Sequence, residues 1–206
     1  MKDIILMGPK HSGKTTTGKA LASLFSCDFI DIDELILQRT GKSPRQLFSE
    51  DLAIFQKAEA EALAALVDSC GNLVGSCGGA NGTSIANSAD NAAAGTNITD
   101  CADNAGAKRR VIAAGGGLID NNEAMSILKK SGAVTVYLDI SAEDAWDRIA
   151  AGGELPPFLR TENPRETHRA LHERRAAAYL QIAKIVIKTE GKPPQERAAE
   201  IFSRLN

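Results

Sequence analysis

Apolar residues recur along this chain in short runs that alternate with amphipathic stretches of helical period. Five runs are near-continuous in apolar residues, as in strands buried on both faces of a sheet: Asp3–Met7, Asp28–Ile30, Val111–Ala114, Val134–Leu138 and Ile185–Lys188. Because strands alternate with helices, the pattern predicts an α/β fold with three αβα layers around a five-stranded parallel sheet. A ligand is expected at the carboxyl ends of the strands.

The stretches between these runs predict helices, several of which carry end signals. The predicted helices cover residues 16–25, about 44–65, 121–130, 142–150, a segment following Pro164, and 194–205. Ser141 stands three residues before Asp144, close to the pattern of a helix N-terminal cap. Pro164 suits a first helical turn, and Gly132 suits a helix end.

Residues 71–107 do not fit this plan. They are rich in Asn, Ala, Gly and Ser, with no aromatic residue and no Lys or Arg. Such a segment has too few apolar residues to fold alone, so a flexible low-complexity insertion in a single domain, residues 1–206, is expected. A functional lid is the alternative for this segment.

Composition sets the broad class. With 206 residues the chain can form one domain with a full core. The balance of 24 Lys and Arg against 26 Asp and Glu predicts neither a nucleic-acid partner nor a membrane surface. No signal peptide or long apolar run is evident, so a cytoplasmic protein is expected. No apolar surface helix argues against a monomer, which is the expected form. The four cysteines follow no zinc or redox spacing and are interpreted as plain thiols.

The most specific motif is the sequence Gly-Pro-Lys-His-Ser-Gly-Lys-Thr at residues 8–15, a full match to the phosphate-binding loop pattern. It lies between a predicted strand and a predicted helix, which is the context that the motif requires. Backbone N–H groups and the helix N-terminus would surround the phosphates of a nucleoside triphosphate. Lys14 would reach the β- and γ-phosphates, and the Thr15 hydroxyl would serve Mg²⁺. The expected nucleotide-binding residues are Gly8, Ser12, Gly13, Lys14, Thr15 and Thr16. The alternative is a glycine-rich turn that binds nothing.

Two carboxylates follow the second predicted strand. Asp31 and Asp33, at i and i+2, would point the same way from an extended chain, beside the phosphate loop. One could hold Mg²⁺ and the other could accept the proton of an attacking hydroxyl. Alternatively, Asp33 caps a helix that begins at Glu34.

Three glycines, Gly115–Gly117, end the third predicted strand. Glycines there let a ligand approach the backbone N–H groups. An ordinary tight turn is the alternative, although it would not require three.

Together these segments resemble the shikimate kinase family. The resemblance covers nearly the whole chain except the insertion: the phosphate loop, Phe29–Asp33, Gln38–Ser43, the triple glycine, Val136–Leu138, Arg175–Tyr179 and Ala183–Thr189. It implies a P-loop kinase fold with a lid over residues 151–164. It also implies transfer of the γ-phosphoryl group of ATP to a hydroxyl of shikimate, with Mg²⁺, in aromatic amino-acid biosynthesis.

The same resemblance implies roles for single residues. Lys14 and Asp33 would be catalytic, and Asp31 with Thr15 would support Mg²⁺. The acceptor would be bound by Asp33, by backbone groups of Gly115, Gly116 and Gly117, and by Arg175 at its carboxylate. Arg148 falls near an arginine on the adenine side of the family's site.

The chain departs from the family pattern at two arginines. Gln56 stands where a carboxylate-binding arginine is expected, and the adjacent Lys57 would face about 100° around the helix. Pro156 stands where the lid arginine is expected. Losing an arginine that stabilises the transferring phosphoryl can lower the rate by about 10³–10⁵. Arg160 is either a displaced substitute or a solvated lid charge.

Three functions compete on this evidence. The first is phosphorylation of shikimate. The second keeps the chemistry but uses a less acidic polyol or sugar acid, because of Gln56. The third is a nucleotide-binding module that has lost catalysis, because of Pro156.

Overall fold

The structure is a computed structural model, and it describes residues 2–68, 109–152 and 155–206. Its five strands form one parallel sheet in the order β2-β3-β1-β4-β5. The strands are β1 (Ile4–Met7), β2 (Asp28–Asp31), β3 (Arg110–Ala113), β4 (Val134–Asp139) and β5 (Ile185–Lys188). The predicted α/β fold is confirmed, and each predicted strand agrees with an observed strand to within one residue at each end.

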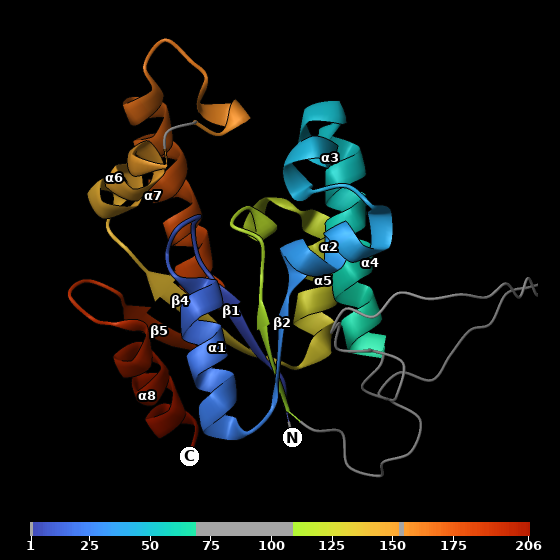
Figure 1. Cartoon of the computed structure of the whole chain (residues 1–206), viewed down its shortest axis with the longest axis vertical. Coiled ribbons are helices and arrows are strands. Elements are labelled where there is room, and N and C mark those ends of the chain that lie inside the picture. Colours follow the sequence, from blue (N-terminus) through green and yellow to red (C-terminus); the bar gives the residue numbers. More distant parts are fainter. Residues whose placement is uncertain (1, 69–108, 153–154) are drawn as a thin grey trace, which may run out of the picture.

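Helices cover both faces of the sheet (Figure 1). The α-helices are α1 (Lys14–Phe25), α2 (Ile32–Thr40), α3 (Pro44–Glu50), α4 (Leu52–Asp68), α5 (Asn122–Ser131), α6 (Ala142–Ala151), α7 (Pro164–Ile182) and α8 (Pro194–Leu205). Two short 3-10 helices, η1 (Leu118–Asp120) and η2 (Pro157–Leu159), lie in the connections. None of the described helices is long and apolar enough to cross a membrane.

The sheet separates two apolar cores. Strand β1 sends Ile5 and Met7 into a core shared with helices α2, α4, α5 and α7. Its alternate residues, Ile4 and Leu6, pack into a second core with α1 and α8. All four side chains are buried, which explains why the sequence of β1 is continuously apolar rather than alternating.

One predicted helix is two helices. The expected helix over residues 44–65 breaks at Asp51, whose backbone is extended, with φ −162° and ψ 130°. The Asp51 carboxylate accepts a hydrogen bond from Ala53 N at 2.7 Å and so supports the start of α4. The periodicity of apolar residues continues through the break, so it did not reveal it. The expected insertion at 71–107 lies outside the described residues.

Gly18 of α1 provides a test of the packing between α1 and β2. A Cβ atom at this position would overlap the Phe29 ring. Gly→Ala inside a helix usually stabilises by about 1 kcal/mol. Here we expect Gly18→Ala to destabilise the protein by about 1–3 kcal/mol, because the ring must move within a packed core. Urea unfolding would measure this, and the double variant Gly18→Ala/Phe29→Leu should recover part of the loss. A stabilised single variant would contradict the packing described.

Candidate active site

The phosphate-loop motif forms the turn between β1 and α1. Gly8 has φ +145° and Gly13 has φ +88°, conformations that residues with a Cβ rarely adopt. A Cβ at Gly8 would also lie 2.8 Å from the carbonyl oxygen of Leu138. Thr16 Oγ1 donates to Gly13 O at 3.1 Å, and the Ser12 side chain is fully buried in the loop. The backbone thus has the curl that the motif predicts.

Lys14 folds back over the loop that precedes it. Its Nζ donates to Gly8 O at 3.0 Å and to Pro9 O at 2.8 Å. Burial lowers the pKa of Lys14 to about 8, against the opposing attraction of Asp33 and Asp31. A triphosphate would supply the anionic oxygens that this buried ammonium lacks.

Two arginines hold the next carbonyls of the loop. Arg148 of α6 donates to His11 O at 2.9 Å, and Arg197 of α8 donates to Ser12 O at 3.1 Å. Arg197 also donates from Nε to Lys192 O at 3.0 Å. Arg197 is only 5% exposed, and burial lowers its pKa. Within the described chain no ion pair joins its guanidinium to a carboxylate, so its charge adds to the potential beneath the loop.

Asp31 joins the loop to β2. Its Oδ2 accepts from Thr15 Oγ1 at 2.8 Å, and its Oδ1 accepts from Asp33 N at 3.0 Å. Asp31 is therefore the N-cap of α2, which begins at Ile32. The alternative that Asp33 caps a helix starting at Glu34 is wrong. The expected extended chain through both carboxylates is also wrong, because the helix starts two residues earlier than Glu34.

Asp33 lies in the first turn of α2 and faces the triple glycine. Its Oδ1 is 3.6 Å from where a Cβ of Gly115 would be. Although the Asp33 residue is exposed at one side, partial desolvation of its carboxylate first, and then the neighbouring Asp31, raise its pKa, while Lys14 and Lys10 oppose the shift. A carboxylate with a raised pKa is a better proton acceptor.

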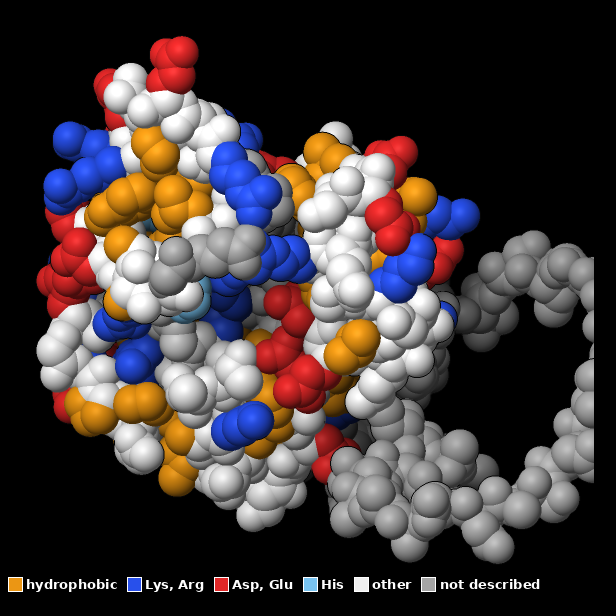
Figure 2. All heavy atoms as spheres, turned by 45° about the horizontal axis from the view of Figure 1, so that its top comes forward, with side chains coloured by type: hydrophobic (Ala, Val, Ile, Leu, Met, Phe, Trp, Pro, Cys, Tyr) orange, Lys and Arg blue, Asp and Glu red, His pale blue; other side chains and the backbone are white. Residues whose placement is uncertain are grey.

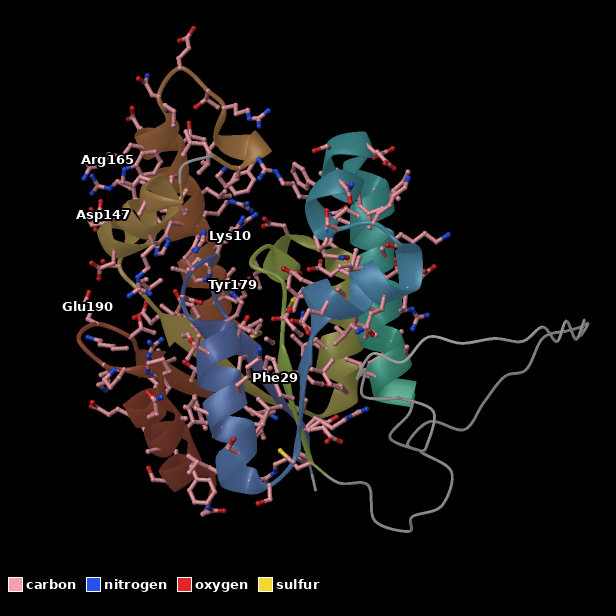
Figure 3. All side chains as sticks on the ribbon, viewed as in Figure 1. Lys10, Phe29, Asp147, Arg165, Tyr179 and Glu190 are labelled. Atoms are coloured by element: carbon pink, nitrogen blue, oxygen red, sulfur yellow. The ribbon has the colours of Figure 1, made fainter. Side chains whose placement is uncertain are left out.

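The Gly115–Gly117 turn is packed so closely that side chains would not fit. A Cβ at Gly116 would lie 2.9 Å from Lys10 N, in the phosphate loop. A Cβ at Gly117 would lie 3.2 Å from Arg175 Nη2, and one at Gly115 would overlap a carboxylate oxygen of Glu59. The glycines therefore let three other elements approach this turn. Figure 3 labels Lys10 on the loop above β1.

Arg175 of α7 reaches the same turn. Its Nε and Nη2 both contact Asp120 Oδ2, at 2.8 and 2.7 Å. Arg174 pairs with the other oxygen, Asp120 Oδ1, at 3.0 Å. Tyr179, one helical turn after Arg175, donates to Gly116 O at 3.3 Å.

Of the two departures from the family pattern, Gln56 lies near Arg175, and Pro156 directly precedes η2. Gln56 of α4 extends toward η1, where its Nε2 donates to Asp120 O at 3.3 Å. Lys57 points away and is 74% exposed beside Glu61, as its position on the helix predicts. Residues 152–163 connect α6 to α7, so Ala151 and Pro164 of the expected lid are helix ends. Phe158 of this connection lies edge-on to Phe48 at 6.3 Å.

Phe158 also packs near Arg175, whose Cζ is 5.8 Å from its ring centroid. The connection between α6 and α7 thus reaches from α7 across to α3. Arg160 follows η2 on an exposed part of this connection, and its role at the phosphoryl group stays a prediction.

Opposite charges face one another across this edge of the sheet. Figure 2 shows a hollow with acidic side chains on one wall and Lys and Arg side chains on the other. The structure brings together Lys14, Thr15, Asp31, Asp33, Gly115–Gly117 and Arg175 at the carboxyl ends of β1, β2 and β3. Arg148 lies at the outer side of the phosphate loop.

Sequence reasoning missed Glu59, Asp120 and Arg197. Glu59 of α4 is fully buried; its Oε2 accepts from Asn121 Nδ2 at 3.0 Å, and Oε1 has no hydrogen-bond partner among the described residues. Burial raises the pKa of Glu59 to about 7, partly opposed by the bond from Asn121. The only available signal was an acidic residue within an otherwise apolar helix stripe.

A parallel sheet with helices on both faces, together with a phosphate loop at the end of β1, defines the class of P-loop kinases. Three comparisons narrow this class. The family model described as shikimate kinase matches residues 10–99 and 97–206. The chain therefore belongs to the shikimate kinase family.

Individual relatives agree over nearly full length. The shikimate kinase of Thermodesulfovibrio yellowstonii is 30% identical over 203 residues, covering 98% of this chain and 94% of the relative. The shikimate kinase of Acinetobacter baumannii, solved in complex with shikimate, has a TM-score of 0.74 and 25% identity, covering 100% of this chain and 93% of that one. The Aquifex aeolicus enzyme has a TM-score of 0.68 and 29% identity, with 98% and 95% covered.

The raised pKa of Glu59 predicts that the free energy of unfolding depends on pH. Its folded-state pKa of about 7 lies above the unfolded value of 4.5, so the folded state retains a proton that the unfolded state has released. The stabilisation that this retained proton gives to the folded state is fully present below pH 4.5 and is lost as pH rises through 7. Glu59→Gln, which does not titrate, should therefore gain stability relative to wild type between pH 5 and pH 8, by on the order of 2 kcal/mol. Denaturant unfolding at both pH values measures the difference. Glu61→Gln, exposed on the same helix, is the control and should show little change.

The position of Arg197 behind the phosphate loop predicts that changing it weakens the binding of ATP. Arg197→Met removes two hydrogen bonds and a positive charge behind the phosphate loop, so we expect KM for ATP to rise about tenfold. KM for the acceptor should stay within about twofold, and Arg197→Lys should recover part of the loss. Arg204→Met, more exposed on the same helix, is the control. Equal losses for both substrates, tracking a lower melting temperature, would assign Arg197 a purely structural role.

Proposed function

We propose that this protein transfers the γ-phosphoryl group of ATP to a hydroxyl group of shikimate, giving shikimate 3-phosphate and ADP. One observation supports this above the others: the phosphate loop and the acceptor-side turn touch, at Lys10 and Gly116. Lys14 and Asp33 lie on one side of that contact and Arg175 on the other. Phosphoryl donor and carboxylated acceptor would thus meet at one place.

Each residue has a chemical task in this proposal. Lys14 holds the β- and γ-phosphate oxygens and offsets the charge that develops on them. Asp33 orients the acceptor hydroxyl and takes its proton as the new O–P bond forms. The bond between the γ-phosphorus and the bridging oxygen breaks, and ADP leaves. Arg175 pairs with the carboxylate of shikimate and fixes which hydroxyl faces the phosphate.

Thr15 and Asp31 fit a magnesium ion. Their side-chain oxygens lie 2.8 Å apart and are the hard donors that Mg²⁺ prefers. The described residues contain no cluster of three or more acidic, His or Cys side chains suited to a metal, so water and phosphate oxygens would supply the other ligands. Bound there, Mg²⁺ would neutralise phosphate charge. Arg148 would contact the nucleotide on its adenine side, and a cytoplasmic monomer is the proposed form.

One observation favours a second acceptor. Gln56 stands where a second arginine is expected. It is uncharged and donates to Asp120 O, so Arg175 is the one guanidinium assigned to the acceptor. A less acidic polyol or sugar acid would require only the one guanidinium that remains.

A coupled assay of ADP release with ATP, Mg²⁺ and shikimate tests the proposed function. We expect shikimate-dependent ADP release and a new phosphate ester in the ³¹P NMR spectrum. Asp33→Asn should lower kcat by about 10²–10⁴, because the proton acceptor is lost while the shape is kept. Lys14→Met should lower it by at least a similar factor.

The same assay identifies the preferred acceptor. Polyols and sugar acids run beside shikimate should give a kcat/KM at least tenfold lower. A better rate with one of them would replace shikimate as the acceptor. ADP release that needs no acceptor, or an unaffected Asp33→Asn variant, would contradict the proposed mechanism.

A further inference from the structure

Asp120 already holds the guanidinium that the proposed function assigns to the acceptor. Arg175 Nε and Nη2 form one of the two edges of the guanidinium that can bind a carboxylate, and both contact Asp120 Oδ2, at 2.8 and 2.7 Å. The remaining nitrogen, Nη1, makes a long contact of 3.4 Å to Gly116 O. An incoming carboxylate therefore finds this edge of Arg175 occupied by a carboxylate of the protein itself.

The pair is shielded enough for this competition to matter. The Arg175 side chain is 18% exposed and that of Asp120 is 25% exposed. Phe158 covers Arg175 from one side, with 5.8 Å from Cζ to the ring centroid. Screening by solvent is weaker here than at an exposed pair, so each charged partner of Arg175 affects the other.

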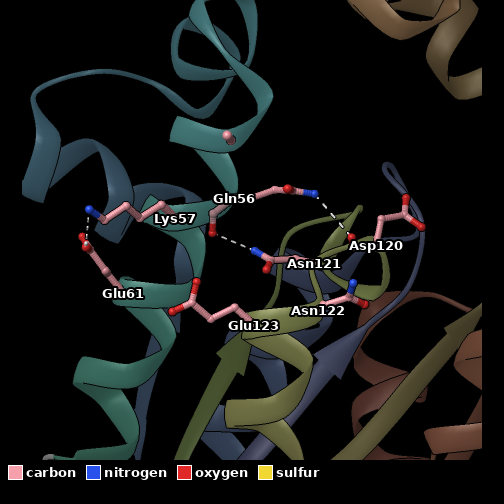
Figure 4. Close-up of a pocket in the computed structure, with 8 residues that line it drawn as sticks. Gln56, Lys57, Glu61, Asp120, Asn121, Asn122 and Glu123 are labelled. Carbon is pink, nitrogen blue, oxygen red and sulfur yellow. Dashed lines mark hydrogen bonds and ion pairs between the residues drawn. The ribbon is translucent and has the colours of Figure 1, made fainter.

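A pocket beside Asp120 offers space for its side chain away from Arg175. The backbone of Asp120 is fixed, because Gln56 Nε2 donates to Asp120 O at 3.3 Å. Asp120 lines a pocket of about 320 Å³ between α4 and the start of α5, whose other charged lining residues are Lys57, Glu61 and Glu123 (Figure 4). We expect the side chain to turn from Arg175 toward this pocket while the η1 turn stays in place. Arg174, 63% exposed, can follow the carboxylate.

We propose that Asp120 occupies the carboxylate-binding edge of Arg175 until an acidic acceptor displaces it, so that Asp120 sets the selectivity of this enzyme for the charge of its acceptor. The inference rests on the proposed function, since it takes Arg175 as the acceptor's partner. With Gln56 in place of a second arginine, displacing Asp120 weakens binding of a carboxylated acceptor. An uncharged acceptor does not need to displace it.

If Asp120 had only a structural role, removing it would change KM for an acidic acceptor in the opposite direction. If Asp120 only orients Arg175, its removal loosens the guanidinium and raises KM for an acidic acceptor. If Asp120 competes, its removal lowers that KM. The two roles therefore separate in one variant.

The test compares Asp120→Asn with wild type on shikimate and on its uncharged methyl ester. We expect KM for shikimate to fall about three- to tenfold, with KM for ATP and kcat within about twofold. The ratio of kcat/KM for acid over ester should rise by the same factor. Glu166→Gln, an exposed position in the first turn of α7 with the same change of charge, should leave the ratio unchanged. A higher KM for shikimate, or an unchanged ratio, would overturn the proposal.

Calorimetric binding of shikimate without nucleotide separates this inference from the proposed function. If wild type turns over shikimate but Asp120→Asn binds it no more tightly, the inference fails and the function stands. If shikimate binds only to Asp120→Asn, the competition is supported although wild-type turnover fails. If neither protein binds or turns over shikimate, both are wrong.

Discussion

The contact between Gly116 and the backbone of Lys10 is the constraint on which this site depends. Strands β1 and β3 are neighbours in the sheet, so the loops at their carboxyl ends emerge side by side. A side chain at Gly116 would push these loops apart, because its Cβ would lie 2.9 Å from Lys10 N. Glycine at this position keeps the nucleotide side within reach of the acceptor side. In phosphoryl transfer much of the catalysis is positioning and charge stabilisation, so the close approach of these two loops is a condition for the proposed transfer.

The phosphate loop is held in shape by cations from three helices. Lys14, Arg148 and Arg197 donate to four of the five loop carbonyls from residue 8 to residue 12: those of Gly8, Pro9, His11 and Ser12. These hydrogen bonds restrain the backbone of the loop on which a phosphate would be bound. The three charges also raise the local potential. Arg197 bonds both to the loop at Ser12 O and to the β5–α8 connection at Lys192 O. A segment near the N-terminus and one near the C-terminus therefore meet at the phosphate loop.

Sequence patterns predicted the parts of the structure that depend on local information. The bounds of β5 and α8 were predicted to the residue, because an apolar run and a proline at the first helical turn mark them. The break at Asp51 and the early start of α2 were missed, because one capping side chain decided each against a continuing apolar period. Lys14, Asp33 and Arg175 could be proposed because motifs carry them. Glu59, Asp120 and Arg197 could not, because their importance comes from partners far away in sequence.

The acceptor side therefore differs in physical character from the nucleotide side. Around the phosphate loop, cations exceed the carboxylates that they contact, and an anionic ligand completes the charge balance. Around Gly115–Gly117 the balance is reversed. Asp33 and Glu59 both have raised pKa values, and Asp120 already neutralises Arg175. Replacing an arginine by Gln56 removes a positive charge from a site that would receive a carboxylate. Such a site binds an acidic acceptor more readily where some of its own negative charge is neutralised or moved, and a protonated Glu59 together with the proposed displacement of Asp120 would do this.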